Sequence, residues 1–568
     1  MMLQTQLADL IHKAARKAQK KGDLPKFELP EITINRAKRE GQGDFSSALA
    51  LQIIRPVNNA RKEKGERTLS PLQVAEIIAR RMDQVDFVSK VEPAKPGFLN
   101  LTIDPGWLAA QAGEITRVGA EYFQVELGKG ERVQVEFVSA NPTGPLHFGG
   151  ARNAAIGDTL ARLLENSGYE VQREYYINDR GAQVDIFGET LWRRYQQLHG
   201  IETDIPEDGY PGAYMIDYAR AIQAERGDSL LALSDEEAVP RFRGMGLALV
   251  TAELADDLGM MRVFFDNWFS EQSLYEDGTF EHVSAILRDQ GDLYLKDDAV
   301  WFAASKYLPK SDRDEVFIRS NGEPGYYASD IAYHYNKFIT RGFDRVIDVW
   351  AVDHQNQAAR MPAMLKALGI DPDRLIVVLY DLVTLKRGGK EVKLSKRSGE
   401  IVTMREVLEE VGPDAARYLL LSRSNEARID FDIDLAVAES SENPVYYVQY
   451  AHARVSSILR KAEEAGVDYT NADLSLLTCP EELALLQKML QLPEIVTEAV
   501  QRLAPHHLPH YALDLAKTFT KFYDACRVLS ADPADREITH ARLTLVRATQ
   551  IELAYVLDLM GMNAPEVM

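Results

Sequence analysis

The sequence is poor in cysteine, since Cys479 and Cys526 are the only two among its 568 residues. Two thiols exclude a disulfide framework and a zinc site of the CxxC…CxxC kind. We therefore expect no zinc, no other metal centre and a reducing compartment, the cytoplasm. Long apolar runs are also lacking, because none approaches the roughly 20 residues of a membrane span. No membrane partner is expected.

The beginning of the chain lacks the apolar core of a secretory signal. Apolar residues recur at helical spacing over residues 3–14, which predicts an amphipathic helix of a first domain rather than a targeting peptide. Internal repeats and low-complexity segments are missing as well, which argues against a solenoid or a repeat array. The length favours several domains in one globular chain.

Positive charge is in deficit, and the formal net charge is −21. This balance disfavours a sequence-blind nucleic-acid binder, and we expect no DNA partner. It does not exclude a protein that meets RNA on a local basic patch. The composition, 46% hydrophobic and 27% charged, suits a globular protein with sizeable cores.

A strand, a glycine-rich loop, a helix and a second strand follow one another over residues 132–179. Residues 132–141 (RVQVEFVSAN) alternate apolar and polar, which predicts a strand. Apolar residues then recur at helical spacing from Ile156 to Leu164, and Gly168 marks the end of that helix. Residues 170–179 predict the second strand. This order is a βαβ unit of a parallel sheet.

The loop of this unit, GPLHFGG, opens onto the helix N-terminus. Unpaired backbone N–H groups there bind phosphates well, and Gly149 and Gly150 would let a nucleotide approach closely. His147 would add a positioned donor. The loop lacks GxGxxG and GxxxxGK[ST], which disfavours a dinucleotide fingerprint and a P-loop. A tight turn with a capping histidine remains the alternative at this point.

The rest of the chain indicates an α/β protein with a doubly wound parallel sheet and two flanking domains. Residues 344–352 and 374–383 are near-continuous apolar runs, as in buried parallel strands. Residues 113–130 look like a linker, and the segment from about 180 to 300 looks like an insertion. We predict an α+β N-terminal domain over 1–112, a Rossmann-like domain over 125–405, and an all-α part over 406–568 with a helix bundle from about 440.

A second basic motif, EVKLSKRSGE (391–400), follows the strand predicted at 374–383. Alone, such a cluster is usually a solvated loop. Ligands of doubly wound sheets, however, bind beyond the carboxyl ends of the strands. Lys393 and Lys396 could therefore stabilise the charge that develops when a triphosphate is cleaved.

HFGG resembles the HIGH motif, and KLSKR resembles the KMSKS motif, of class I aminoacyl-tRNA synthetases. Further stretches in order along the chain, GYYASDIAYH, DVWAVDHQNQAARM, GPDAARYLLLSRS, NPVYYVQYAHAR and the terminal APEVM, are similar to the arginyl-tRNA synthetases of bacterial type. The resemblance implies ATP-dependent activation of L-arginine to arginyl-adenylate and transfer to tRNA(Arg), with release of pyrophosphate and AMP. It implies Mg²⁺ with ATP, a monomer, and activation that needs bound tRNA.

The resemblance also implies site residues. We expect Asp330 to face the guanidinium, since a carboxylate can receive it bidentately. A helix N-cap for Asp330, a core position for His354, and core tyrosines with surface arginines in the bundle are the alternatives. The expected arginine-binding residues are Glu136, Ser139, Asn141, Tyr326 and Asp330. The expected ATP-binding residues are His147, Gly149, Gly150, Asp353, His354, Lys393, Ser395 and Lys396, of which His147, Lys393 and Lys396 are expected to be catalytic. The expected tRNA-binding residues are Tyr447, Tyr450, Arg454 and Arg527.

The chain departs from the HIGH pattern at Gly150, where the family places a second histidine. Loss of one transition-state donor can cost on the order of 100-fold in rate. His147 and the lysines of KLSKR could suffice, Arg152 or Asn153 could substitute, or the chain could be a weakened relative. We favour the first two.

Two other functions compete with an arginine-specific enzyme. A non-catalytic tRNA-binding protein on the same scaffold is favoured only by Gly150. Another class I synthetase is the second alternative, but a cysteine-specific enzyme would want a zinc site that two cysteines cannot build. A glutamate-specific pocket should be basic, whereas Glu136 and Asp330 are acidic.

Overall fold

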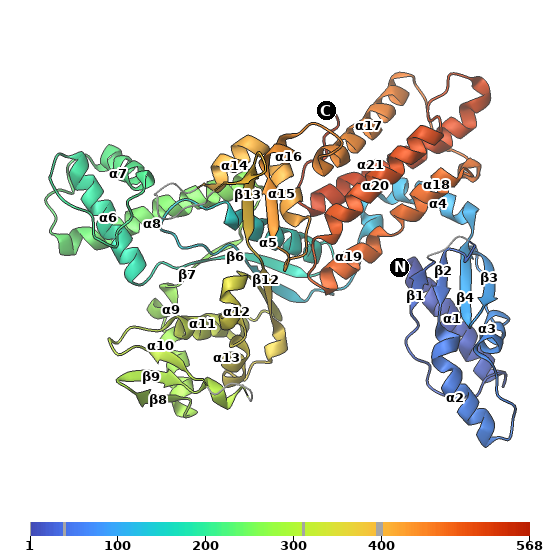
Figure 1. The fold of residues 1–568 in the computed structure, drawn as a ribbon, viewed down its shortest axis with the longest axis horizontal. Coiled ribbons are helices and arrows are strands. Elements are labelled where there is room, and N and C mark those ends of the chain that lie inside the picture. Colours follow the sequence, from blue (N-terminus) through green and yellow to red (C-terminus); the bar gives the residue numbers. More distant parts are fainter. Residues whose placement is uncertain (1, 38–40, 309–312, 393–401) are drawn as a thin grey trace.

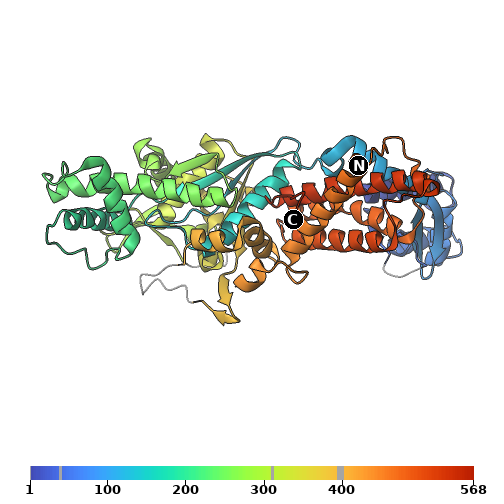
Figure 2. The ribbon, with the colours of Figure 1, turned by 90° about the horizontal axis from the view of Figure 1, so that it is seen from above.

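The computed structural model describes residues 2–37, 41–308, 313–392 and 402–568. Three parts lie along one long axis: a central α/β domain, a helical part, and an N-terminal domain (Figures 1 and 2). Lys393, Ser395 and Lys396 lie outside the described residues. Within the described ranges, every helix is too short or too polar to cross a membrane.

The central domain contains a five-stranded parallel sheet in the order β12-β11-β5-β6-β7. The order reverses between β5 and β11, and the carboxyl ends of strands on the two sides of such a point form a crevice where ligands bind. The doubly wound fold predicted from the sequence is therefore confirmed. The strands are β5 (Arg132–Glu136), β6 (Glu170–Ile177), β7 (Asn267–Ser270), β11 (Arg345–Ala351) and β12 (Leu375–Tyr380).

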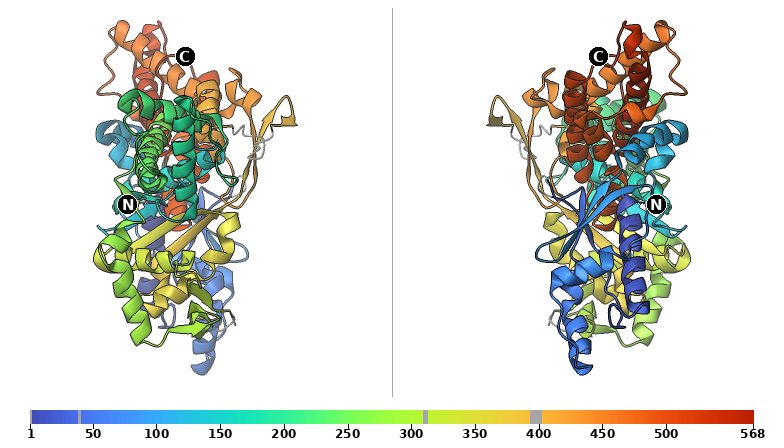
Figure 3. Two further views of the ribbon diagram at one scale, coloured as in Figure 1. Left: turned by 90° about the vertical axis from the view of Figure 1, so that its left-hand side faces the viewer. Right: turned by 90° about the vertical axis from the view of Figure 1, so that its right-hand side faces the viewer.

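Two strand predictions were too long. The strand predicted at 132–141 ends at Glu136, because Val138 and Ser139 take positive φ angles of 67° and 41°. The strand predicted at 374–383 ends at Tyr380, and residues 383–387 form β13 (Val383–Arg387) of a second sheet. That sheet also contains β14 (Lys390–Glu391) and β15 (Ile429–Asp432). The β13–β14 hairpin turns at Gly388 and Gly389, both at positive φ, and projects from the body of the molecule (Figure 3).

Helix α5 (Gly149–Glu165) packs against β5 without a side chain at Gly157. A Cβ atom at Gly157 would lie 2.2 Å from Cγ of Phe137. Phe137 is buried and cannot retreat into solvent. The glycine is therefore required by the close approach of helix and sheet.

We predict that Gly157→Ala lowers the free energy of unfolding by about 1–3 kcal/mol, because the added methyl group overpacks the core. Urea unfolding followed by circular dichroism measures the change. The matched control is Gly244→Ala in α8 (Asp235–Met260), where a Cβ atom would meet nothing within 4 Å. That control should gain up to about 1 kcal/mol from helix propensity. Equal effects of the two substitutions would contradict the packing argument.

The segment predicted as an insertion is interrupted by a strand of the main sheet. It begins as helices α6 (Ala182–Leu198), α7 (Ala213–Arg226) and α8, which extend to the left in Figure 1. Strand β7 then returns to the central sheet beside β6. After it come α9 (Ser273–Glu276), α10 (Thr279–Asp289), and a small antiparallel sheet of β8 (Leu293–Lys296), β9 (Ala299–Phe302) and β10 (Glu315–Ile318).

Helices between β10 and the C-terminal part carry several of the predicted site residues. They are α11 (Tyr326–Tyr335), α12 (Gln355–Ala358), α13 (Met361–Ala367), α14 (Met404–Val411), α15 (Pro413–Leu421) and α16 (Ile433–Val437). The helical part predicted from about residue 440 follows. It consists of α17 (Pro444–Glu464), α18 (Pro480–Met489), α19 (Leu492–Gln501), α20 (His507–Ala525) and α21 (Arg536–Leu559).

The N-terminal domain is α+β, as predicted. Its four-stranded sheet has the order β1-β2-β4-β3. The elements are α1 (Leu3–Lys20), β1 (Ile34–Arg36), β2 (Phe45–Ser47), α2 (Leu49–Glu63), α3 (Pro71–Ala79), β3 (Val88–Ala94) and β4 (Phe98–Ile103). The linker predicted at 113–130 is partly wrong, because residues 113–118 belong to helix α4 (Pro105–Val118). Helix α4 packs on α18 and α21 of the bundle rather than on the central sheet.

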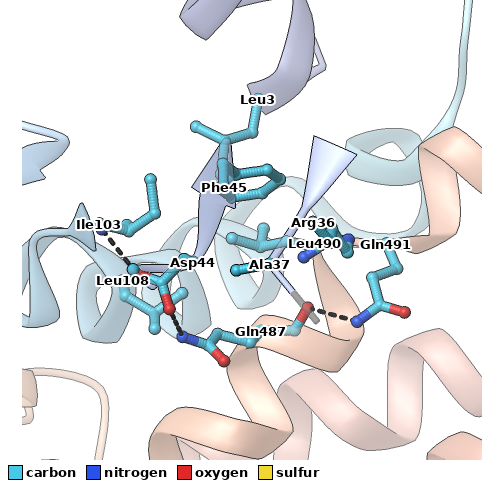
Figure 4. A pocket seen from close by; sticks show the side chains of 11 residues that line it. Leu3, Arg36, Ala37, Asp44, Phe45, Ile103, Leu108, Gln487, Leu490 and Gln491 are labelled. Carbon is cyan, nitrogen blue, oxygen red and sulfur yellow. Dashed lines mark hydrogen bonds between the residues drawn. The ribbon is translucent and has the colours of Figure 1, made fainter. Parts of the chain in front are cut away.

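Polar contacts join the N-terminal domain to the bundle (Figure 4). One carboxylate oxygen of Asp44 accepts from the side chain of Gln487 (2.7 Å), and the other accepts from Ile103 N (2.7 Å). Arg36 donates two hydrogen bonds to Glu494 (3.0 and 3.3 Å). A cavity of about 360 Å³ lies between these pairs. The two domains thus meet through directional contacts.

The two cysteines, far apart in the sequence, meet in the bundle. The Cys479 thiol donates to Glu481 (2.9 Å), and the ligand atoms of Cys479, Glu481 and Cys526 lie within 4.8 Å of one another. Structural zinc sites are almost always built from four ligands. Three donors fall short of that set, and both cysteines are free thiols.

Candidate functional site

The C-terminal end of β5 is a strained turn held by Asn153. A β-branched residue at positive φ is a rare conformation, and it persists only where surrounding contacts impose it. Asn153, on the first turns of α5, accepts from Val138 N (2.7 Å) and donates to Val349 O on β11 (2.9 Å). One amide therefore links the two strands on either side of the reversal point.

The hypothesis that Arg152 or Asn153 replaces the missing histidine is wrong. Asn153 is buried, and its side-chain amide is already hydrogen-bonded to Val138 N and Val349 O. Arg152 is fully buried, and its guanidinium donates to Asp381 O (2.5 Å) and Ser424 O (3.0 Å). Burial lowers the pKa of Arg152 to about 10. Both side chains tie α5 to its neighbours and do not face the glycine-rich loop.

His147 is oriented by the loop that contains it. The backbone N–H of Gly149 donates to Nδ1 of His147 (2.9 Å). Because Nδ1 accepts, the neutral ring carries its proton on Nε2, which is then a donor. A Cβ atom at Gly150 would lie 2.9 Å from Cδ1 of Leu146, so a side chain there would displace Leu146. The glycine at the position of the second histidine is therefore packed into the loop.

Backbone hydrogen bonds join the loop of His147 to residues 402–404. Met404 N donates to Leu146 O (2.7 Å), and Phe148 N donates to Val402 O (3.2 Å). Residues 402–404 follow the segment 393–401, which contains Lys393, Ser395 and Lys396 and lies outside the described residues. The chain that follows the second motif is thus anchored beside His147 from residue 402 onward.

Asp330 lies inside helix α11 and not at its N-cap, so the capping alternative is wrong. Its carboxylate accepts from the side-chain amide of Gln357 on α12 (2.5 Å). Burial raises the pKa of this carboxyl, while His334 and Gln357 act in the opposite direction. A half-buried carboxylate bonded to a neutral amide keeps its charge available for a cationic ligand.

Glu136 lies at the last position of β5 with only 6% of its surface exposed. Its carboxylate accepts from the Ser139 hydroxyl (3.0 Å) and from Nζ of Lys337 (2.6 Å). Burial raises the pKa of Glu136, and Lys337 opposes that effect. Ser139 Oγ also accepts from Tyr176 N (3.1 Å), which fixes the strained turn against β6.

Asn141 is exposed and belongs to a cluster of amides. It donates to Oε1 of Gln183 (3.1 Å) and accepts from Asn178 (3.1 Å). Asn178 follows β6, and Gln183 begins α6. The amide of Asn141 therefore lies above the strand ends with donor and acceptor groups toward solvent.

Three other predicted residues border a neighbouring cavity of about 810 Å³, namely Tyr326, Asp353 and His354. Tyr326 is 79% exposed, with the Arg319 guanidinium 5.4 Å from its ring centroid. Asp353 and His354 follow β11 in a short turn, and both are exposed. The alternative of a core position for His354 is therefore wrong. Gln357 lines the same cavity and connects it to Asp330.

In the bundle, two of the four predicted tRNA-binding residues share an aromatic surface. The Arg454 guanidinium lies 4.4 Å from the ring centroid of Tyr523 and 5.8 Å from that of Tyr450. Tyr446 stacks on Tyr450. By contrast, Tyr447 is half-buried and donates to Thr520 (3.1 Å). Arg527 is exposed after α20 and donates to Leu529 O (3.1 Å).

Sequence reasoning missed several residues of these clusters. Gln357 stands within the quoted DVWAVDHQNQAARM stretch and could have been found from its spacing to Asp353. Lys337 and His334 follow Asp330 on a run that reads as an ordinary helix. Tyr446 stands within the quoted NPVYYVQYAHAR stretch but was not selected, and Tyr523 was not considered. Nothing in the sequence separates these side chains from core or surface residues.

Comparisons with known proteins cover nearly the whole chain. Residues 3–103 match the family model of the arginyl tRNA synthetase N terminal domain. Residues 114–456 match the catalytic domain of class I (R) tRNA synthetases, and residues 448–568 match the DALR anticodon binding domain.

Full-length relatives agree. The chain is 46% identical over 558 residues to an arginine–tRNA ligase of Dehalococcoides mccartyi, with 98% of each chain covered. It is 43% identical to one of Caldanaerobacter subterraneus, over 99% of this chain and 98% of the relative. The solved arginyl-tRNA synthetase of Thermus thermophilus superposes with a TM-score of 0.75 at 26% identity, with all of both chains covered. The fold, the ordered matches and the site residues lead to one conclusion: the chain belongs to the arginyl-tRNA synthetases.

Proposed function

We propose that the protein is an arginine–tRNA ligase that activates L-arginine with ATP and transfers it to tRNA(Arg). The observation that supports this most directly is the carboxylate of Asp330, bonded to the neutral amide of Gln357, with Glu136 at the carboxyl end of β5. A carboxylate beside a neutral amide can receive a guanidinium bidentately. The loop of His147 begins at the same end of the same sheet.

In this proposal the arginine side chain enters between α11 and the end of β5. Asp330 receives the guanidinium, and Glu136 forms the acidic wall behind it, held by Ser139. Asn141 binds the amino-acid end of the substrate, where its amide is exposed. Tyr326 closes over the ligand from the first turn of α11, a movement that its exposed position permits.

ATP binds along the other side of the reversal point, as its Mg²⁺ substrate complex. The amides of Gly149 and Gly150 at the start of α5 receive phosphate oxygens. Nε2 of His147 donates to a phosphate oxygen, while Asp353 and His354 meet the adenosine. Lys393, Ser395 and Lys396 are assigned from the motif alone and would neutralise charge on the triphosphate. The arginine carboxylate attacks the α-phosphorus, pyrophosphate leaves, and the tRNA ribose hydroxyl then takes the acyl group.

The bundle would hold the anticodon end of tRNA(Arg). Aromatic rings and guanidinium planes stack on unpaired bases. The surface of Tyr450 and Arg454, with Tyr446 and Tyr523, offers both kinds of group. Arg527 would contact the backbone, and Tyr447 would support the surface from within. We also place the protein in the cytoplasm. We propose that it is a monomer, and sedimentation analysis at micromolar concentration would test this oligomeric state.

ATP–pyrophosphate exchange with L-arginine, with and without total tRNA, tests the proposed function. We expect exchange that depends on arginine and appears only when tRNA is added. Omission of arginine is the matched control, because a contaminating synthetase would exchange with its own amino acid. No exchange together with intact tRNA binding would favour the non-catalytic protein, the reading that Gly150 supports.

A further inference from the structure

Lys337 is a fully buried cation at the base of the proposed arginine pocket. It lies on a π-helical turn (Asn336–Thr340) that continues α11, and none of its side chain is exposed. Nζ contacts Oε2 of Glu136 at 2.6 Å and Oδ1 of Asp348 at 2.9 Å. A buried ammonium is costly unless it is paired and hydrogen-bonded. This lysine therefore joins β5 to β11 across the reversal point.

His334 is a second basic residue in the same network. Nε2 faces the carboxylate of Asp348 at 3.0 Å, and Nδ1 faces the backbone oxygen of Asp330 at 2.8 Å. Burial alone would raise the pKa of Asp348, but Lys337 and His334 outweigh it and bring that pKa to about 2. The imidazole thus lies between an acid of β11 and the backbone of α11.

The network distributes its cations unevenly. Glu136 and Asp348 each contact a cation, whereas the Asp330 carboxylate accepts its hydrogen bond from a neutral amide. The next carboxylate along the sheet, Glu174, has its own partner in Arg341. The two inner acids therefore share one ammonium, whereas the half-buried carboxylate of Asp330 is bonded to a neutral group.

We propose that Lys337 sets the charge of the arginine pocket by pairing with both Glu136 and Asp348, so that Asp330 presents its negative charge to the guanidinium. This inference rests on the proposed function. Lys337 is a positioning residue, since it acts through the carboxylates and does not touch the substrate. Without it, two unpaired buried carboxylates would share protons, and the charge offered to arginine would vary with pH.

Several titratable groups face Lys337 and must be considered in any pH profile. They are Glu136 on β5, Asp348 on β11, Tyr333 on α11, whose ring lies 4.2 Å from Nζ, and Glu174 on β6. Glu271 lies beyond Asp330, and burial raises the pKa of its carboxyl, with Asp330 adding to that effect. Lys337 is the one group that contacts both Glu136 and Asp348 within the described residues.

The test compares Lys337→Met, Glu136→Gln and the double variant, with Lys366→Met, at an exposed position of α13, as control. The readout is the KM for arginine and for ATP in tRNA-dependent exchange between pH 6 and 9. We expect Glu136→Gln to raise the arginine KM about 10-fold or more, because Lys337 then loses one of its two acidic partners and its positive charge opposes the guanidinium. The double variant, which removes one charge of each sign, should have an arginine KM at least about fivefold lower than that of Glu136→Gln.

Lys337→Met should give an arginine KM that varies more steeply with pH than that of the parent chain, with the ATP KM within about twofold. A merely structural role would lower activity at every pH alike and give no recovery in the double variant. If Lys337→Met does not fold, as judged by circular dichroism, the comparison of Glu136→Gln with the double variant decides alone. A double variant no better than Glu136→Gln would overturn the inference.

Asp330→Asn separates this inference from the proposed function. If that variant leaves the arginine KM unchanged, the pocket is not where arginine binds, and the proposed function of these residues fails. If Asp330→Asn impairs arginine binding but the double variant shows no recovery, only the role of Lys337 fails.

Discussion

Asp330→Asn is expected to reduce kcat/KM for arginine by on the order of 100- to 1000-fold, with the ATP KM nearly unchanged. Removing one partner of a buried charge pair costs about 3–5 kcal/mol, which corresponds to this loss. The substitution keeps the size of the side chain and an acceptor for Gln357, so the fold should survive. Arginine-dependent, tRNA-dependent exchange measures the effect.

The matched control is Asp289→Asn at the exposed end of α10, which should exchange like the parent chain. A parallel titration with the uncharged analogue citrulline sharpens the result, since the variant loses preference for the cation. An Asp330→Asn variant that keeps its arginine KM would show that another acid receives the guanidinium.

His147→Ala is the second large effect that we expect. It should lower kcat on the order of 100-fold or more, because it removes a donor aimed at developing phosphate charge. The arginine KM should change little, since Nδ1 of His147 is bonded to Gly149 and the proposed partner of its Nε2 is a phosphate of ATP. Single-turnover formation of arginyl-adenylate in the presence of tRNA measures the chemical step.

His12→Ala on α1 is the control for loss of a histidine elsewhere. An unchanged kcat in His147→Ala would contradict a role for the loop in phosphate chemistry. The expected loss of kcat matters because position 150 holds a glycine where the family has a second histidine. With glycine there and Arg152 and Asn153 engaged elsewhere, His147 is the imidazole that this loop contributes.

Much of the fold could be predicted because the spacing of apolar residues shows which face of a strand or helix is buried. The alternation at 132–136 and the helical spacing from Ile156 to Leu164 correspond to β5 and α5. The length of β5 was less predictable, because the turn at Val138 and Ser139 that ends the strand is imposed by Asn153 of α5. The apolar run at 374–383 is divided between two sheets, and local sequence carries no sign of that division.

Site residues that stand in a sequence motif could be predicted. Residues whose role depends on a hydrogen-bond or ion-pair partner far away in the sequence could not. His147 and Asp330 stand in motifs, so their positions followed from the resemblance. The buried charges of Arg152 and Lys337 look like surface residues in the sequence, because long-range carbonyls and carboxylates satisfy them only after folding. The role of Gln357 depends on a contact with α11 that no local pattern contains.

Helix α4 packs on a part of the molecule that its place in the sequence does not suggest. Although it follows the N-terminal domain in the chain and precedes the catalytic sheet, it is packed on α18 and α21. Together with the Asp44–Gln487 and Arg36–Glu494 contacts, it packs the first and last parts of the sequence against each other. A tRNA bound to both parts would therefore meet them as one combined surface, although they lie at opposite ends of the sequence.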